Sequence, residues 1–277
     1  MKKNTLRTIA AAGAFAMALT LLPAGSAQAA SVSYLPTKSV SYDMDNGKWV
    51  KSAVGKISYN KKGLTKLSTS TSYLPDGSKS GPASKIVYTY SGSKLRTLKE
   101  YSGKDLLHSE TNKYDKKGRL VKVKSILSMD MPAETTYKYK GKGKKPVSSV
   151  YYFQGRKSSS TKYSYRGRTE TQKTTYTDGT KETATYRYNK SGRLIKMTTS
   201  SPDYKSTTTY KYDKWGNVTK LTSKNSYGSY VTKYSYQYYK KKFVKQEIAT
   251  TTEYDTDGKL TSTSAAKTVY SGFKKFK

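Results

Sequence analysis

A tyrosine-based motif recurs along most of this chain at nearly constant spacing. Its clearest copy lies within residues 209–221 and reads Tyr-x-Tyr-Asp-x-x-Gly, followed by two aliphatic residues three positions apart. Sister copies start near Tyr59 and lie 23 to 26 residues apart, with one interval of 31. A period near 24 held over seven intervals indicates a repeat architecture, which constrains the fold more than any single residue does.

Each unit is predicted to contain two β-strands and two turns. In six units a second tyrosine precedes the first by two residues, so both rings lie on one face of a strand. A segment such as Asp115-Lys116-Lys117-Gly118 follows, in which the Asp or Asn side chain accepts backbone amides and glycine tolerates positive φ. A strand of threonine, lysine and aliphatic residues comes next, and a second turn ends it. Because these connections are short, sequence neighbours are expected to pair antiparallel.

Together the units predict an all-β chain, an antiparallel β-hairpin repeat array of about 24 residues per repeat that forms one long twisted, curling sheet. Eight units correspond to about sixteen strands, or roughly 75 Å of sheet at 4.8 Å per strand. An open sheet of that width is expected to curl, and the sequence leaves open whether it closes into a barrel. It also leaves open whether Leu95 and Leu98 share one face through a bulge or mark a sheet that is lightly apolar on both faces.

The segments that flank the repeats have their own characters. Residues 1–29 combine Lys2, Lys3 and Arg7 with an apolar run and the end Ala27-Gln28-Ala29, which is typical of a secretory signal peptide. Residues 30–56 contain a degenerate unit that is predicted to cap the array. The repeats are assigned to residues 57–260, and residues 261–277 form a basic C-terminal tail, of which residues 269–277 are a second capping candidate.

Export and the lack of cysteine together suggest a cellular location. Cysteine is absent, although export would permit disulfides. This absence is commoner in exported chains of Gram-positive bacteria than in animal secretion. The sequence therefore favours a secreted, extracellular or cell-wall-associated protein of a Gram-positive bacterium, with no membrane span in the mature chain.

Four copies of the turn motif carry a resemblance to a known family. Residues 114–120 read Tyr-Asp-Lys-Lys-Gly-Arg-Leu, residues 188–194 replace Asp by Asn, and residues 212–218 and 254–260 are looser copies. These segments resemble the YD repeats of the Rhs family of secreted and surface proteins, over roughly residues 57–260. The resemblance implies hairpin strips that spiral into large shells, surface carbohydrate binding and, in some members, a C-terminal toxin. This chain is too short for a large shell, and only 17 residues follow Leu260, so no toxin domain is expected.

No catalytic or metal-binding constellation stands out in the sequence. His108 is the only histidine and the eighteen acids are scattered, so neither a metal cluster nor a catalytic triad is indicated. Residues 43–47 and 255–258 begin like calcium loops but lack the later bidentate glutamate, and ordinary turns are the favoured interpretation. Glycosidase chemistry needs two acids across a cleft, and no such pair is marked. A non-enzymatic protein without a cofactor is therefore expected.

The positive charge points to a class of partner. The formal net charge is +35, and loss of the three basic residues of the signal peptide would leave +32. Such an excess creates a strong positive field beyond what solubility requires. It predicts binding to anionic cell-wall polymers or polysaccharides, and to nucleic acid without sequence preference, by counterion release.

Particular side chains are candidates for polymer contact. For the Tyr-x-Tyr pairs a structural role in cross-strand packing is favoured over stacking on sugars or bases. Tyrosines of second strands and loops, a turn tryptophan and lysine clusters are better exposed candidates. These candidate residues are Tyr151, Tyr152, Trp215, Tyr227, Tyr230, Tyr239, Lys116, Lys117, Lys240, Lys241 and Lys242.

The leading hypothesis is thus a secreted, non-enzymatic repeat protein that binds anionic or carbohydrate polymers at the bacterial cell surface. The alternative is a structural scaffold, or a Rhs-like shell fragment, associated with a toxin or a surface protein. The sequence does not indicate an oligomeric state.

Overall fold

The computed structural model describes residues 33–127, 131–240 and 242–276, so the expected signal peptide lies outside the described residues. Within them the chain forms only strands and connecting turns. The strands are β1 (Ser33–Leu35), β2 (Lys38–Asp45), β3 (Lys48–Tyr59), β4 (Thr65–Ser72), β5 (Ser84–Ser91), β6 (Lys94–Ser102), β7 (Asp105–Tyr114), β8 (Leu120–Leu127), β9 (Met131–Tyr139), β10 (Pro146–Phe153), β11 (Arg156–Arg166), β12 (Thr169–Tyr176), β13 (Lys181–Tyr188), β14 (Leu194–Ser200), β15 (Lys205–Tyr212), β16 (Val218–Asn225), β17 (Gly228–Tyr239), β18 (Phe243–Tyr254), β19 (Leu260–Ser271) and β20 (Lys274–Phe276).

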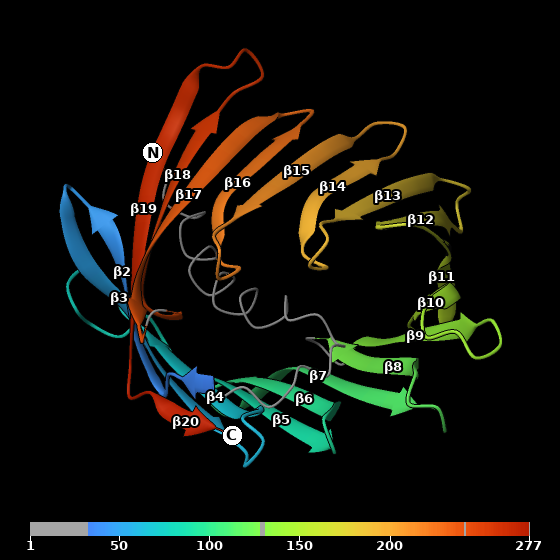
Figure 1. The fold of residues 1–277 in the computed structure, drawn as a ribbon, viewed down its shortest axis with the longest axis horizontal. Helices are drawn as coiled ribbons and strands as arrows, with labels where there is room; N and C mark the ends of the chain where they lie inside the picture. The colour runs from blue at the N-terminus through green and yellow to red at the C-terminus, as the bar shows by residue number, and fades with distance from the viewer. Residues whose placement is uncertain (1–32, 128–130, 241, 277) are drawn as a thin grey trace.

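Eighteen of these strands, β2 to β19, form a closed antiparallel barrel in which neighbours in sequence are neighbours in the sheet. Figure 1 looks along the barrel and shows the strands following one another around the ring in chain order. The hairpin repeats and the antiparallel pairing are confirmed. The expected open, curling sheet is wrong, because β19 pairs with β2 and leaves the array without a free edge. Closure satisfies the backbone groups that an open edge would expose.

The closing strands come from the segments that were expected to cap opposite ends of an open array. Six residue pairs join β19 to β2, from Ala266 opposite Asp43 to Ser271 opposite Lys38. The hydroxyls of Ser41 and Thr268 lie 3.2 Å apart across this seam. Strand β3 crosses the boundary assigned at residues 56 and 57, and β19 crosses the one assigned at residues 260 and 261. The flanking segments therefore add the strands that complete the ring.

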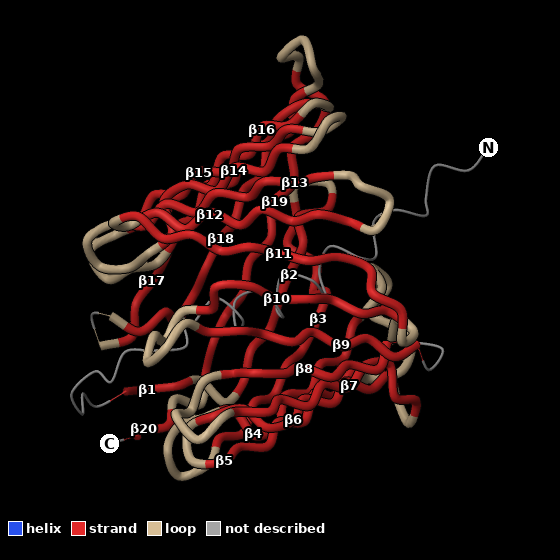
Figure 2. Tube along the Cα trace, turned by 90° about the vertical axis from the view of Figure 1, so that its right-hand side faces the viewer, coloured by secondary structure: helices blue, strands red, loops and turns tan. Residues whose placement is uncertain are grey.

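A small second sheet lies at the end of the barrel where the seam begins. Strands β1 and β20 pair with each other (Figure 2), and Phe276 of β20 packs edge-on against Tyr59 with ring centroids 5.4 Å apart. Phe276 and Leu35 also lie 3.3 to 3.5 Å from where a Cβ on Gly63 would stand, so this turn fits a glycine closely. The two terminal strands thus cover the first turn of the array.

The turn motif folds as its residue types predict. In the first copy, Asn60 Oδ1 accepts the amides of Lys62 and Leu64 at 2.9 and 3.0 Å, and Gly63 has a φ of +73°. Similar turns follow β7, β13 and β15, and together with the other turns that end odd-numbered strands they lie at one end of the barrel, here called the Gly-turn rim.

A β-bulge accompanies many of the rim turns. It decides whether Leu95 and Leu98, which are three positions apart, lie on the same face of the sheet. The register shifts next to the tyrosine before the turn, for example between Thr89 and Tyr90. As a result Leu95 lies opposite Tyr90 and Leu98 lies opposite Tyr88. Because Tyr88 and Tyr90 share a face, the bulge brings both leucines to that same face.

Register assigns the paired residues to two faces, because directly opposed residues share a face. The side chains that are less than 9 % exposed, or at that limit, all lie on the face that carries the Tyr-x-Tyr rings; among them are Ile57, Ala133, Ala184, Ser149 and Thr232. Side chains converge on the concave side of a closed sheet, so this is the inner face. Among the described residues no large side chain is fully buried. Sheet hydrogen bonds and lateral contacts therefore contribute much of what an aliphatic core supplies elsewhere.

Candidate functional site

Each repeat contacts the next through a tyrosine hydroxyl at the Gly-turn rim. The tyrosine that precedes the turn donates to a backbone carbonyl at the start of the neighbouring strand, with oxygen–oxygen distances of 2.5 to 3.1 Å. The donors in the described residues are Tyr59, Tyr90, Tyr114, Tyr139, Tyr165, Tyr212 and Tyr236. The structural role expected for these rings thus includes a lateral hydrogen bond as well as packing.

A basic side chain covers several of the same rings. The guanidinium carbon of Arg119 lies 4.5 Å from the ring centroid of Tyr139, and the ammonium group of Lys145 lies 4.5 Å from that of Tyr165. Lys94 over Tyr114 and Arg193 over Tyr212 repeat the arrangement at 5.5 and 5.9 Å. Distances within about 6 Å of a ring centroid are those of cation–π attraction.

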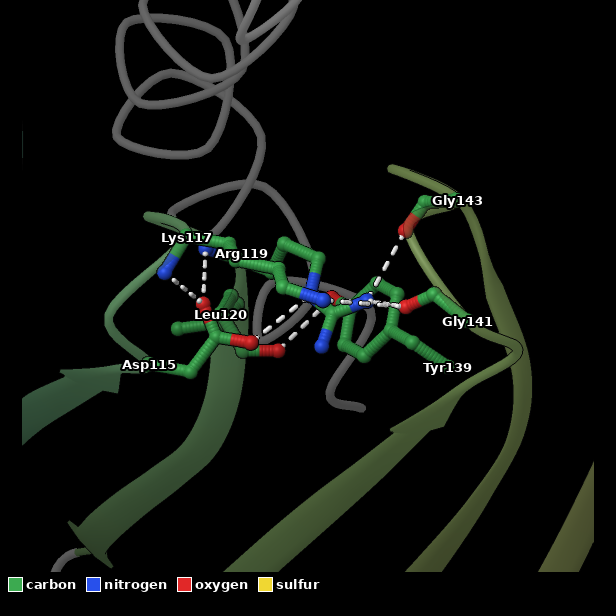
Figure 3. Close-up of polar contacts among 7 residues, drawn as sticks. All are labelled: Asp115, Lys117, Arg119, Leu120, Tyr139, Gly141 and Gly143. Carbon is green, nitrogen blue, oxygen red and sulfur yellow. Dashed lines mark hydrogen bonds and ion pairs between the residues drawn. The ribbon is translucent and has the colours of Figure 1, made fainter.

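Arg119 shows how far one such contact extends (Figure 3). Its Nε donates to Asp115 Oδ2 at 2.7 Å, and its Nη1 donates to the carbonyls of Gly141 and Gly143 at 2.9 and 3.1 Å. Asp115 Oδ1 meanwhile accepts the amides of Lys117 and Arg119, both at 2.9 Å. These hydrogen bonds hold the pKa of Asp115 below its usual range, the one from the Arg119 amide being the largest cause. Arg119 therefore joins its own turn to the turn of the next repeat.

The inner face combines tyrosines with most of the strand carboxylates. Six glutamates lie on it by register: Glu100, Glu110, Glu170, Glu182, Glu247 and Glu253. Burial raises the pKa of Tyr59 and of Tyr137 to about 12. Burial also raises the pKa of Glu247, although a hydrogen bond with Tyr236 opposes it. Some of the inner-face carboxylates accept hydrogen bonds from a neighbouring side chain, as Glu110 does from Asn112 and Glu170 from Gln172.

The outer face carries the lysines. Basic residues that register places there include Lys56, Lys99, Lys113, Lys122, Lys124, Lys138, Lys157, Lys162, Lys173, Arg187, Lys196, Lys211, Lys220, Lys224 and Lys233. The described part of the chain contains two ion pairs, and one of them, Lys122 with Glu134 at 2.7 Å, lies on this face. The strands thus separate charge, with lysine outside and most glutamate inside.

The candidate contact residues do not converge on one site. Trp215, which is 41 % exposed, lies in a turn of the Gly-turn rim beneath the ammonium group of Lys214. Tyr227, which is 76 % exposed, lies in the β16–β17 turn at the opposite rim beside Tyr204, with ring centroids 6.3 Å apart. Tyr151 lies on the inner face opposite Ser159, whereas Tyr152 lies opposite Glu134 on the outer face.

The remaining candidates occupy separate places as well. Lys116 and Lys117 lie in the turn after β7, where Lys117 Nζ is 3.5 Å from the Gly141 carbonyl. Tyr230 is on the inner face opposite Glu253. Tyr239 stacks on Phe273, Lys240 Nζ lies 4.4 Å from the Tyr34 ring centroid, and Lys242 covers Phe243. Lys241 lies outside the described residues.

The structure also places the histidine and the two calcium-loop-like segments considered above. His108 lies opposite Glu100 on the inner face. Residues 33–127, 131–240 and 242–276 contain no group of three or more His, Cys, Asp or Glu side chains that could hold a metal ion. The turns at Asp43 to Gly47 and Asp255 to Gly258 are tight strand connections with a glycine at positive φ.

The rim contacts between repeats were missed at the sequence level. A basic residue stands at the start of the return strand, directly before its first residue at Arg119, Lys145 and Arg193 and as the first residue itself at Lys94. The tyrosine that each covers follows 19 or 20 residues later. This fixed offset is the signal that could have indicated them.

Comparison with known proteins assigns no family. No family model matches the chain, and no curated protein matches it. Among solved structures, a porin-like protein from Bacteroides uniformis aligns with a TM-score of 0.48 and 11 % identity, covering 85 % of this chain and 98 % of that one. A porin-like protein from Bacteroides vulgatus aligns with a TM-score of 0.41 and 14 % identity, covering 87 % of this chain and 100 % of that one. Likeness at this level leaves the function of the chain unassigned.

The description of the chain as a YD or Rhs repeat protein is not supported, because no family model matches the chain and its sheet closes into a barrel. The turn motif is the part of the resemblance that the fold retains. The chain is better described as an all-β barrel of repeated hairpins. A place at the cell surface and the Gram-positive wall both stay predictions. Helices long and apolar enough to cross a membrane are absent from the described residues.

Proposed function

We propose that this chain is an exported, non-enzymatic barrel that binds anionic polymers at the cell surface through the lysines of its outer face. The observation that carries the proposal is the separation of charge between the two faces. Most strand glutamates are inside, so they do not neutralise the outer lysines by direct pairing. A polyanion that lies on the outer face gains counterion release from many lysines at once.

The composition of the outer face also bears on its surroundings. A lysine that faces lipid at the midplane of a bilayer costs about 2–4 kcal/mol in a β-barrel. Lysines such as Lys99, Lys124 and Lys173 are exposed on the outer face in the interior of separate strands. In the proposed function these strands therefore face water and dissolved or wall-bound polymers.

Carbohydrate recognition enters this proposal through charge. Tyrosines such as Tyr139 and Tyr165 use their hydroxyls within the fold, and the exposed rings of Trp215 and Tyr227 lie at opposite rims. An acidic polysaccharide therefore meets many lysines, whereas for a neutral one these exposed rings do not form a single stacking surface. A scaffold role for a second protein stays a prediction.

Binding of the mature protein, residues 30–277, to immobilised polymers tests the proposal. Teichoic acid, an acidic polysaccharide and DNA serve as anionic probes, and a neutral polysaccharide serves as the control. We expect binding to the anionic probes that weakens steeply as salt rises, and none to the control. Protein whose lysines have been acetylated, with the fold checked by circular dichroism, should lose binding. Failure to bind any anionic probe at low salt would overturn the proposal.

A further inference from the structure

Basic residues line up across five neighbouring strands of the outer face. Lys211 of β15 lies directly opposite Lys220 of β16, which in turn lies directly opposite Lys233 of β17. Arg187 of β13 lies directly opposite Lys196 of β14. These five residues are called the basic row below.

One diagonal step makes the row continuous. Lys196 lies opposite Thr209, which is two residues before Lys211 on the same face. Directly opposed side chains have Cβ atoms about 4.5–5.5 Å apart, and diagonal neighbours are about 7–8 Å apart. The Cβ atoms of the row therefore follow one another around the barrel at intervals of roughly 5 to 8 Å. Of the five, all except Lys220 are exposed, and Lys220 is half-buried between its two lysine neighbours.

The same-face strand positions that flank the row carry neither carboxylates nor aromatic rings. These neighbours, two positions along each strand, are Thr185, Thr198, Thr209, Thr222, Val231 and Ser235. The carboxylate of Asp213, two residues after Lys211, accepts amides of its own turn, beyond the end of β15. Like charges directly opposite one another across strands are destabilising. An external anion bound along the row would relieve this repulsion, in the role that neighbouring carboxylates would otherwise fill.

We propose that the basic row is the principal binding track for a phosphodiester polymer that lies around the circumference of the barrel. The inference rests on the proposed function and specifies its ligand class. Four of the five cations are lysines, which bind phosphate as point charges. The absence of rings among the flanking positions removes the stacking platforms that nucleobases use. The row therefore recognises the chain of phosphates and not what the phosphates carry.

Matched triple variants of the mature protein test the assignment. The row variant carries Lys211→Gln, Lys220→Gln and Lys233→Gln. The control variant carries Lys99→Gln, Lys138→Gln and Lys157→Gln, three outer-face lysines opposite uncharged partners. Both variants lose three positive charges, so a difference in their affinities shows that the positions of the lysines matter and not only their number. The probes are an oligothymidylate, an abasic phosphodiester strand with the same number of phosphates, and a glycerol phosphate polymer.

We expect the row variant to lose about tenfold or more in affinity at low salt, and its salt dependence to fall by about two phosphate contacts. The control variant should lose about twofold in affinity, and the salt dependence of its binding should be nearly unchanged. The oligothymidylate and the abasic strand should bind equally, and competition with the glycerol phosphate polymer distinguishes the two sources of phosphate.

Three results would contradict the inference in separate ways. Equal losses in the two variants would overturn the assignment to the row while leaving the proposed function intact. Binding of the oligothymidylate more than about tenfold tighter than that of the abasic strand would show base stacking and overturn recognition through phosphates alone. No binding by the unmodified protein to any probe would overturn the proposed function itself.

Discussion

Arg119 covers the ring of Tyr139, with the guanidinium carbon 4.5 Å from the ring centroid, while the Tyr139 hydroxyl binds the carbonyl of the residue next to Arg119. The two residues belong to successive repeats, so the arrangement joins the repeats laterally at the rim. This side-chain contact supplements the backbone hydrogen bonds between strands, and it recurs in other repeats of the barrel. The first three predictions below concern this contact.

Arg119→Ala should destabilise the barrel by about 1–3 kcal/mol, because it removes two hydrogen bonds to glycine carbonyls and a cation–π contact. Thermal unfolding followed by circular dichroism measures the effect. Arg166→Ala is the matched control, because Arg166 is an exposed outer-face arginine opposite Thr169. An equal loss in both variants would contradict the role of Arg119.

Tyr139→Phe should cost about 0.5–1.5 kcal/mol, because it keeps the ring and its cation–π contact but removes the hydrogen bond to the Leu120 carbonyl. Tyr227→Phe, at a ring that is 76 % exposed, should change stability little. Chemical denaturation of the two variants decides the matter. The hydroxyl would have no structural role if the midpoints of both variants matched that of the unmodified protein.

Asp115→Asn should fold and should weaken the acid sensitivity of the protein, since Asn60 and Asn189 already perform the same turn role. The folded-state pKa of Asp115 lies below its ordinary value. Its stabilising contribution is therefore present above a pH of about 4 and is lost as the pH falls through the lower folded value. Melting temperatures from neutral to acidic pH should show the unmodified protein more stable at neutral pH and the gap closing in acid. If the difference in melting temperature between the two proteins grew as the pH fell, the direction of the pKa shift assigned to Asp115 would be contradicted.

A cysteine pair at Ser41 and Thr268 should form a disulfide across the seam, because the two hydroxyls are 3.2 Å apart and the chain has no other cysteine. The oxidised variant should migrate faster in denaturing electrophoresis than the reduced one. A pair at Ser41 and Thr251, on strands that do not pair with each other, is the control. Crosslinking in neither variant, with both folded, would argue that the sheet is open.

Lys220→Gln should raise stability by about 0.2–1 kcal/mol at low salt, because Lys220 is directly opposed by a lysine on each side. The gain should shrink as salt screens the charges. Lys99→Gln, whose partners are Val87 and Ser109, should show no such gain. If salt changed the stability of the two variants equally, the predicted repulsion between Lys220 and the lysines opposite it would be contradicted.

The sequence was sufficient for the local structure because local chemistry determines it. Asp115 and Gly118 are three residues apart and define their turn together, and Tyr88 and Tyr90 share a face in any strand. Ring closure was not predictable on the same grounds. It depends on the curvature summed over eighteen strands and on the pairing of Ser41 with Thr268, 227 residues apart, in segments that lack the motif.

The same distinction between local chemistry and long-range pairing applies to the candidate site. Net charge predicted the class of partner, but the alignment of Lys211, Lys220 and Lys233 depends on the register between strands. That register is shifted by a bulge between Lys211 and Tyr212, which counting residues alone does not reveal. Individual tyrosines and lysines chosen for their exposure accordingly lie at separate places on both rims and both faces.

Closure at the Gly-turn rim has a consequence for how such a chain can change in length. Each hairpin leaves this rim and returns to it, and the seam strands β2 and β19 meet there at Lys38 and Ser271. Duplication or deletion of one whole unit would keep both chain ends at the same rim and alter only the girth of the ring. Insertion of a single strand would send one end to the far rim and place β2 and β19 side by side in parallel. Growth that keeps every strand pair antiparallel therefore proceeds in steps of two strands, or about 24 residues.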